Sequence, residues 1–264
     1  MRDEATGELV EDLDDVIDMV LEYNVANMSK VSLPDDQVKE IMRTKARIID
    51  EMLSDNKVKE FPQSLPWDVY IRVMRKVTKQ KKGCFRDIIK SSREFKYALY
   101  LLLDRMYREE ELLDEAAMTW LTKLWKKKGS PLRLKDNRFI HGKEGICKLF
   151  EKCIVQIVAD KLEQATPQCQ AGSRKGRSTH DQLLKLVIIQ KYFEKSGKPL
   201  PLLFVDVASC FDRIQLSDVI YDSIQAGADL KAVRMIHKFS DNTQIKIRGE
   251  DRSGRGALVK GTTG

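Results

Sequence analysis

The apolar run Leu200–Val207 constrains the fold of this chain more than any other feature. It reads Leu-Pro-Leu-Leu-Phe-Val-Asp-Val, and nearly continuous runs of this kind are typical of a strand that is buried on both faces of a sheet. The run is far too short to cross a bilayer. We therefore predict a buried strand at Leu202–Val207 with a charged residue, Asp206, at its end.

Apolar residues at a three- and four-residue spacing predict many helices. The clearest pattern spans Gly145–Glu163 and predicts a core helix. Thr179–Glu194 predicts a second buried helix, with Ser178 or Thr179 as its N-cap. Weaker or shorter patterns of the same kind predict further helices at 11–23, 35–53, 67–76, 95–107, 114–128, 216–224 and 230–239.

Strands are expected late in the chain. Thr243–Arg248 alternates like a strand, Gly249–Gly254 is a polar turn, and Leu258–Val259 is the candidate returning strand of a hairpin. The predicted fold class is therefore α+β, with a helix-rich N-terminal half and few late antiparallel strands. The 264 residues are enough for one large domain or two small ones.

Charged residues make up 33% of the chain, and their distribution is uneven. Met1–Glu22 has nine acids and one base, so it carries −8, and the rest of the chain carries +15. The excess gathers in basic runs at Lys79–Lys82, Lys126–Lys128 and Arg174–Arg177. One such run is usually a solvated face, but several of them indicate a polyanionic partner such as nucleic acid.

The N-terminus and the cysteines indicate a nuclear or cytoplasmic protein. Met1–Glu11 is acidic and polar, unlike a secretory signal peptide. The cysteines form no Cys-x-x-Cys pair, and no histidine stands at ligand spacing from them. We expect no membrane partner, no disulfides and no structural zinc site, but reduced, mostly buried thiols at Cys84, Cys147, Cys153, Cys169 and Cys210.

Asp206 is an aspartate within the predicted apolar strand, where an unpaired carboxylate is costly to bury. Such a side chain needs a cation or a metal ion as its partner. Asp212 follows six residues later, and carboxylates that hold divalent ions serve phosphoryl and nucleotidyl transfer. The alternative is structural, with Asp206 capping the next turn and Asp212 capping the helix beyond it. Spacing alone favours the structural alternative.

The segment Gln170–Thr179 sets three cations among two glycines immediately before a predicted helix. Glycines allow close approach of the backbone, guanidinium groups bind phosphate through paired hydrogen bonds, and a helix N-terminus favours an anion. By itself the segment is also compatible with an ordinary exposed basic loop.

Taken together, these segments resemble the reverse transcriptases of non-LTR retrotransposons and related retroelements. Gln170–Thr179 is similar to their fingers motif, Gln-x-Gly-Phe-Arg-x-Gly-Arg-Ser-Thr. Phe204–Ile214 resembles their first catalytic palm motif, Phe-x-Asp-x-x-Lys-Ala-Phe-Asp-x-Val. Leu124–Ile140 and the Lys-x-x-Glu-Lys pattern of Lys148–Leu162 match the segments that precede these motifs. The resemblance covers about 95–264, and the order and spacing of the motifs agree with the family.

The resemblance implies a nucleotidyl-transfer site with Mg²⁺ as its cofactor. Asp206 is implied as the first metal-binding, catalytic aspartate, with a carbonyl of Val207 as a further ligand. Phe211 is implied as the steric gate beneath the sugar of the incoming dNTP. The implied cations are Arg138, Arg174 and Arg177 at the nucleotide, and Lys126, Lys127, Lys128 and Lys175 along the RNA template and DNA primer.

The resemblance also implies a right-hand polymerase fold in three parts. These are a helical N-terminal region at 1–94, reverse transcriptase fingers at 95–199 and a partial palm at 200–264. The family's Tyr-x-Asp-Asp-like hairpin, which supplies the other metal-binding carboxylate, is absent from these residues. Ser173 also replaces the usual Phe of the fingers motif.

The predicted function is that of a retroelement reverse transcriptase fragment, truncated in the palm. The parent reaction is attack of a primer 3′-hydroxyl on the α-phosphate of a dNTP, and the chain alone is expected to be inactive. A non-catalytic nucleic-acid-binding relic of such a domain is the alternative. A third candidate is an RNA-templated RNA polymerase, against which Arg174–Thr179 and Phe211 argue.

Overall fold

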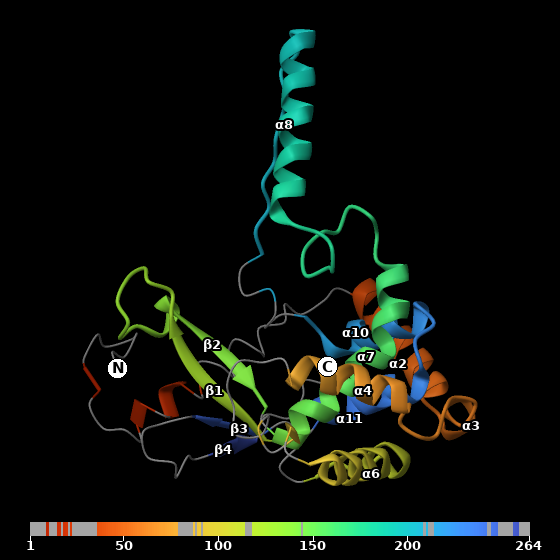
Figure 1. Ribbon diagram of the computed structural model, residues 1–264. Helices are drawn as coiled ribbons and strands as arrows, with labels where there is room; N and C mark the ends of the chain where they lie inside the picture. The colour runs from red at the N-terminus through yellow and green to blue at the C-terminus, as the bar shows by residue number, and fades with distance from the viewer. Residues whose placement is uncertain are drawn as a thin grey trace.

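A body of packed helices carries a small sheet on one side and one long helix that projects away from it (Figure 1). This computed structural model describes residues 9–10, 15–16, 18–20, 22, 36–78, 87, 89–90, 92–113, 118–143, 145–207, 210, 214–241, 244–247 and 256–258. Among the helices in these ranges, none has both the length and the apolar character that crossing a membrane requires.

Most of the predicted helices are confirmed, with ends that differ by a few residues. The residues described within 11–23 are helical as well. The helices of the body are α2 (Asp36–Met52), the single turn α3 (Asp55–Val58), α4 (Trp67–Thr78), α6 (Arg93–Glu109), α7 (Gly145–Ala165), α10 (Leu216–Gln225) and α11 (Leu230–Asp241).

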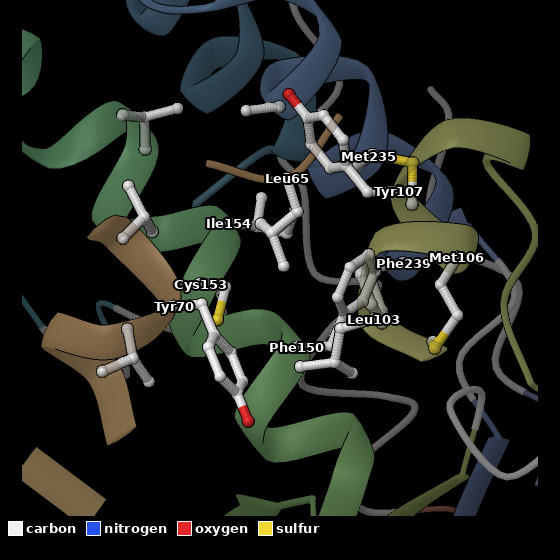
Figure 2. Close-up of a cluster of buried hydrophobic side chains, with 14 of the residues drawn as sticks. Leu65, Tyr70, Leu103, Met106, Tyr107, Phe150, Cys153, Ile154, Met235 and Phe239 are labelled. Atoms are coloured by element: carbon white, nitrogen blue, oxygen red, sulfur yellow. The ribbon is translucent and has the colours of Figure 1, made fainter. Parts of the chain in front are cut away.

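Helix α7 is the centre of the core, as its apolar spacing predicts. Its inner face buries Leu149, Phe150, Cys153 and Ile154, and the Phe150 ring lies 5.4 Å from the ring of Phe239 on α11. Figure 2 shows this face surrounded by side chains from α4, α6 and α11. Burial of a large apolar side chain contributes roughly 1.5–3 kcal/mol, so this cluster holds the helices together. Burial also raises the pKa of the Cys153 thiol to about 12.

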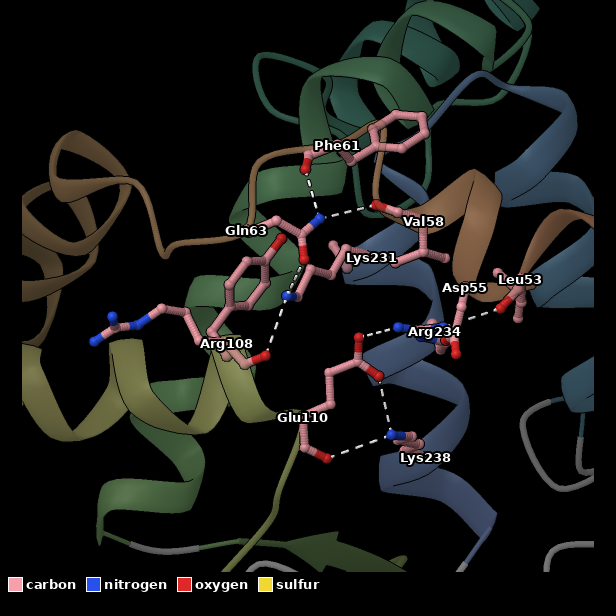
Figure 3. A network of polar contacts seen from close by, with 12 residues as sticks. Leu53, Asp55, Val58, Phe61, Gln63, Arg108, Glu110, Lys231, Arg234 and Lys238 are labelled. Atoms are coloured by element: carbon pink, nitrogen blue, oxygen red, sulfur yellow. Dashed lines mark hydrogen bonds and ion pairs between the residues drawn. The ribbon is translucent and has the colours of Figure 1, made fainter.

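A polar network ties three helices together at the edge of this core (Figure 3). Glu110, which follows α6 in a left-handed conformation, accepts hydrogen bonds from Arg234 and, at 2.9 Å, from Lys238. Arg234 also donates to the Asp55 carboxylate at 2.7 Å. Because Asp55 lies on α3 and both cations lie on α11, the network fixes α3, α6 and α11 relative to one another.

The sheet has four strands in the order β2-β1-β3-β4. Strand β1 (Met118–Trp125) runs antiparallel to β2 (Asn137–Gly142) and parallel to β3 (Gln244–Ile247), and β3 pairs antiparallel with β4 (Gly256–Leu258). The predicted late hairpin is therefore confirmed. The α+β class is confirmed as well. The strands are not all late and antiparallel as predicted, because β1 and β2 precede α7 and β1 pairs with β3 in parallel.

The predicted helix at 114–128 is wrong, because its described residues from Met118 onward form β1. The prediction rested on apolar residues three apart, such as Leu121 and Leu124. The stretch is also rich in threonine and tryptophan, which favour strands. Pairing with β2 on one side and β3 on the other decided between the two patterns.

The predicted strand Leu202–Val207 is also wrong in this structure. Residues 198–207 are irregular, all of them except the partly buried Leu200 are exposed, and Leu203 and Phe204 are 88% and 80% exposed. A strand needs a neighbour for its backbone hydrogen bonds, and no described segment pairs with these residues. Such apolar side chains are normally buried, but no segment in the described part of the chain covers them.

Helix α8 (Thr179–Ser196) confirms one prediction and corrects another. Ser178, one of the two predicted candidates, is its N-cap. The predicted burial is wrong, because none of its residues is buried and Tyr192 is 70% exposed. Figure 1 shows α8 pointing away from the body, with the chain after it running back towards the beginning of the helix.

Candidate nucleic-acid interface

The loop between α7 and α8 is held in shape by Arg174. Its Nε and Nη2 atoms donate to Glu163 Oε1 at 2.9 and 2.6 Å, and Nη1 donates to the carbonyls of Pro167 and Gln170 at 2.7 and 3.1 Å. The hydrogen bond from Arg174 keeps the pKa of the Glu163 carboxyl below its ordinary value. All three guanidinium nitrogens thus have acceptors within the chain, and Arg174 positions the loop. Its implied role at the nucleotide stays a prediction that would require these bonds to open.

The backbone of this loop uses left-handed conformations at Ser173 and Gly176, with φ of +59° and +74°. A Cβ at Gly176 would meet no other atom within 4 Å, so glycine is favoured there by the backbone angle alone. Between these two turns, the exposed Lys175 has no hydrogen bond or ion pair with a described residue. Arg177 follows, and its Nη2 donates to the Gln168 side chain. Lys175 and Arg177 are therefore the cations of the loop that solvent or a ligand reaches.

The beginning of α8 is occupied by a carboxylate from its own sequence. Ser178 Oγ accepts from the Asp181 backbone N–H at 3.2 Å, and Asp181 Oδ2 accepts from the Ser178 N–H at 3.0 Å. This capping box places a negative charge at the end of the helix dipole that favours anions. The beginning of α8 is therefore a weaker phosphate site than the sequence pattern indicates. Lys175 and Arg177 are the nearby cations that would attract a phosphate.

Asp206 lies in the segment that follows α8. The 18 residues of the helix rise about 27 Å at 1.5 Å per residue. At full extension the nine residues from Gly197 to Asp206 reach about 30 Å, so this segment is long enough to return along the whole helix. Figure 1 shows 198–207 running back from the end of α8 towards its beginning, and Asp206 is the second-to-last residue of that segment. The carboxylate is exposed and makes no hydrogen bond or ion pair with a described residue.

The metal site implied by the resemblance is represented by one carboxylate. Mg²⁺ is usually bound through one or two carboxylates together with substrate phosphates, so Asp206 fits one position of such a site. Val207 follows it and is 55% exposed. Within the described ranges, no three His, Cys, Asp or Glu side chains gather to hold a metal ion. Phe211 and Asp212 lie outside the described residues.

The β1–β2 hairpin presents the second group of predicted cations. Its tip is fixed by Asp136, whose Oδ2 accepts from the Ser130 N–H at 2.8 Å. At Gly129, with φ of +71°, an added Cβ would lie 2.3 Å from that carboxylate, so only glycine fits. Lys127 takes a left-handed conformation, and both it and Lys128 are exposed. The rigid turn thus holds the two lysines in solvent.

One face of the hairpin combines cations with apolar side chains. Leu124 lies opposite Arg138 in the strand register, and Ile140 lies two residues further along β2. Arg138 is exposed, and Leu124 and Ile140 are each 50% exposed. Lys126 extends the face, and its Nζ donates to the Lys135 carbonyl. Trp125, which the predicted helix 114–128 would place on its inner face, is 42% exposed next to Lys126 in the sequence. An aromatic residue next to a basic run is the signal that would have identified it.

The structure gathers some of the predicted residues and separates others. Lys175 and Arg177 lie in the loop before α8 and Asp206 lies in the segment that runs back along this helix, whereas Lys126, Lys127, Lys128 and Arg138 lie on the β1–β2 hairpin. Figure 1 shows the hairpin and the loop before α8 in different parts of the molecule. The four cysteines in the described ranges are free thiols, of which Cys147 and Cys153 are buried as predicted and Cys169 and Cys210 are exposed. Cys84 lies outside the described residues.

Comparison with known proteins leaves this interface to be judged from its own geometry. No protein-family model matches the chain, and no curated protein matches it.

Proposed function

We propose that this chain is part of a reverse transcriptase of the non-LTR retroelement type, and that it contacts nucleic acid at the beginning of α8. The return of the segment that carries Asp206 towards the loop that carries Lys175 and Arg177 supports this proposal most strongly. Nucleotidyl transfer requires a carboxylate available to a metal ion and cations that neutralise phosphate, and these two segments carry both. The motif resemblance is the reason for proposing nucleotidyl transfer as the reaction of these residues.

The residues have distinct roles in the proposed reaction. A primer 3′-hydroxyl attacks the α-phosphate of a dNTP, and diphosphate leaves. Mg²⁺, when bound, supplies charge stabilisation for the attacking and leaving oxygens. Asp206 holds the ion through its carboxylate, and Lys175 and Arg177 bind phosphate oxygens. The exposed hairpin cations Lys127, Lys128 and Arg138 follow the backbone of the template and primer.

Replacement of the two loop cations tests the interface. In the double variant Lys175→Ala/Arg177→Ala, we expect the affinity for a short fluorescein-labelled RNA to fall roughly tenfold, because two phosphate contacts are lost. The slope of log affinity against log salt should become shallower by about two. Fluorescence anisotropy over a salt series measures both quantities.

The matched control removes two cations at the other end of α8. Lys195 and Lys198 are exposed, and their replacement by alanine changes the net charge by the same amount. This control should retain nearly all of the affinity. If both variants lost the same affinity for RNA, the loss would reflect net charge and not a contact at the loop. Unchanged binding by Lys175→Ala/Arg177→Ala would refute the proposal.

The alternative of a non-catalytic nucleic-acid-binding protein is favoured by the single carboxylate in the described part of the metal site. We expect the 264-residue chain to bind a primer–template without extending the primer, because Mg²⁺ lacks its second carboxylate. A gel assay for Mg²⁺-dependent dNTP incorporation tests this. Extension by the chain that disappears in Asp206→Asn would show catalysis and remove the alternative.

A further inference from the structure

Three lysines meet where α4 packs against α7, on a surface that the proposed interface does not include. Lys148 and Lys152 stand one turn apart on α7, and Gln156 continues the same ridge. Lys76, in the last turn of α4, donates from Nζ to Gln156 Oε1 at 2.7 Å, which places its ammonium group over this ridge. We call Lys76, Lys148 and Lys152 the lysine triad.

None of the three lysines forms an ion pair with an acid in the described part of the chain. Glu151 is the acid between Lys148 and Lys152 in the sequence, and its carboxylate pairs with Lys143 at 2.8 Å. Lys152 is partly buried, and its pKa is lowered by this burial first and then by the charges of Lys148 and Lys76. No acid contributes to that shift. The structure thus holds three like charges near one another, with no ion pair to an acid in the described ranges.

Such an arrangement is unfavourable in the free protein. Like charges one turn apart on a helix repel, and partial burial deprives the Lys152 ammonium of water. An ordinary solvated lysine face avoids both costs, because its long side chains spread apart and pair with nearby acids. An anion that bound between the three ammonium groups would relieve the repulsion and replace the lost water.

The chemistry of the triad fits a phosphate backbone. Ammonium groups are point charges that donate in any direction, which suits successive phosphates better than one planar carboxylate. In the sequence, α4 leads directly into Lys79-Gln80-Lys81-Lys82, so further positive charge follows along the chain. An extended polyanion uses such a series of charges, whereas a single small anion does not.

We propose that the lysine triad binds the phosphate backbone of RNA as a second contact surface of this protein. The proposal rests on the proposed function, since its partner is nucleic acid, but it concerns a separate face. Lys152 lies 13 residues before the end of α7, about 20 Å along the helix from the loop that carries Lys175. One strand of several nucleotides is long enough to contact both surfaces.

The test removes two of the three charges and keeps the contact between α4 and α7. In Lys148→Gln/Lys152→Gln, the bond from Lys76 to Gln156 remains. We expect the affinity for the same labelled RNA to fall roughly fivefold to tenfold, and the salt slope to become shallower by about two. The loss should multiply with that of Lys175→Ala/Arg177→Ala, because the two surfaces share no residue.

The matched control is Lys57→Gln/Lys59→Gln, which removes two exposed lysines at α3. Circular dichroism and thermal unfolding should show both double variants folded, and the triad variant at least as stable as the parent because a repulsion is gone. Acetylation of the parent protein, followed by mass spectrometry, gives a second measurement. RNA should protect Lys148 and Lys152 from acetylation, and Lys57 should stay reactive.

The outcomes separate this proposal from the proposed function. If Lys175→Ala/Arg177→Ala weakens RNA binding but the triad variant binds like the parent, the triad proposal fails alone. If the parent binds no RNA, both proposals fail. If inorganic phosphate displaced RNA at an equal concentration of phosphate groups, the triad would be a site for a small anion. That result would overturn the proposal that it binds the phosphate backbone of RNA.

Discussion

At the scale of single residues, the same chemical group serves structure or function depending on its neighbours. Arg174 belongs to the motif that suggested phosphate binding, but its guanidinium is satisfied by Glu163 and two loop carbonyls. Lys175, its neighbour in sequence, is exposed. Residue type and spacing do not distinguish these two cations, because the acceptors that engage Arg174 become adjacent only after α7 has formed.

Glu110 offers a test of one such structural residue by pH. Its side chain is 9% exposed, and burial acts to raise its pKa. Hydrogen bonds from Arg234 and Lys238 outweigh burial and leave the pKa of the carboxyl below its ordinary value. A depressed folded-state pKa gives stability that is present above the unfolded-state pKa and is lost as the pH falls through the folded-state pKa.

We therefore expect Glu110→Gln to lower the free energy of unfolding by about 1–3 kcal/mol at neutral pH, because two cations lose a charged acceptor. The difference from the parent should shrink as the medium is acidified below pH about 4, where the glutamate itself becomes protonated. Urea unfolding at several pH values measures both effects. Glu109→Gln is the neighbouring control, because the exposed pair of Glu109 with Arg105 should matter little at any pH. A constant difference down to strongly acid pH would contradict the account.

At the scale of elements, α7 and α8 show how one sequence signal has two outcomes. Both were predicted as buried helices from their apolar residues. Helix α7 lies at the centre of the core, whereas α8 buries no residue. Apolar residues occur almost all round the middle of α8, a pattern that ordinarily belongs to a helix covered on several sides. The described chain supplies covering elements for α7 only.

Matched leucines on the two helices test this difference. Leu149 on α7 is 2% exposed, and Leu184 on α8 is 61% exposed. Leu149→Ala should lower the free energy of unfolding by about 2–5 kcal/mol, because it leaves a cavity in a packed core. Leu184→Ala should change it by less than about 0.5 kcal/mol. Chemical denaturation of both variants decides the matter, and a large cost at Leu184 would show that α8 packs against a partner in solution.

At the scale of the whole molecule, positive charge is spread over separate surfaces rather than concentrated in one cleft. The loop before α8, the β1–β2 hairpin and the lysine triad each expose cations, and they lie on different elements. A polyanion that contacts several of them gains affinity from each, with a strong dependence on salt. The variants Lys175→Ala/Arg177→Ala and Lys148→Gln/Lys152→Gln resolve the contributions of the loop and of the lysine triad, because each removes cations from one surface only.

The sequence by itself determined the helices of the body, the capping of α8 by Ser178, the late hairpin and the basic character of the exposed segments. These features depend on residues that are close together in the chain, so periodicity and capping chemistry predict them. Only the tertiary structure decided that 118–125 is a strand, that α8 and 198–207 are exposed, and that Arg174 is engaged with Glu163. Each of these outcomes depends on whether a distant segment supplies a hydrogen-bonding or packing partner, and local sequence does not contain that information.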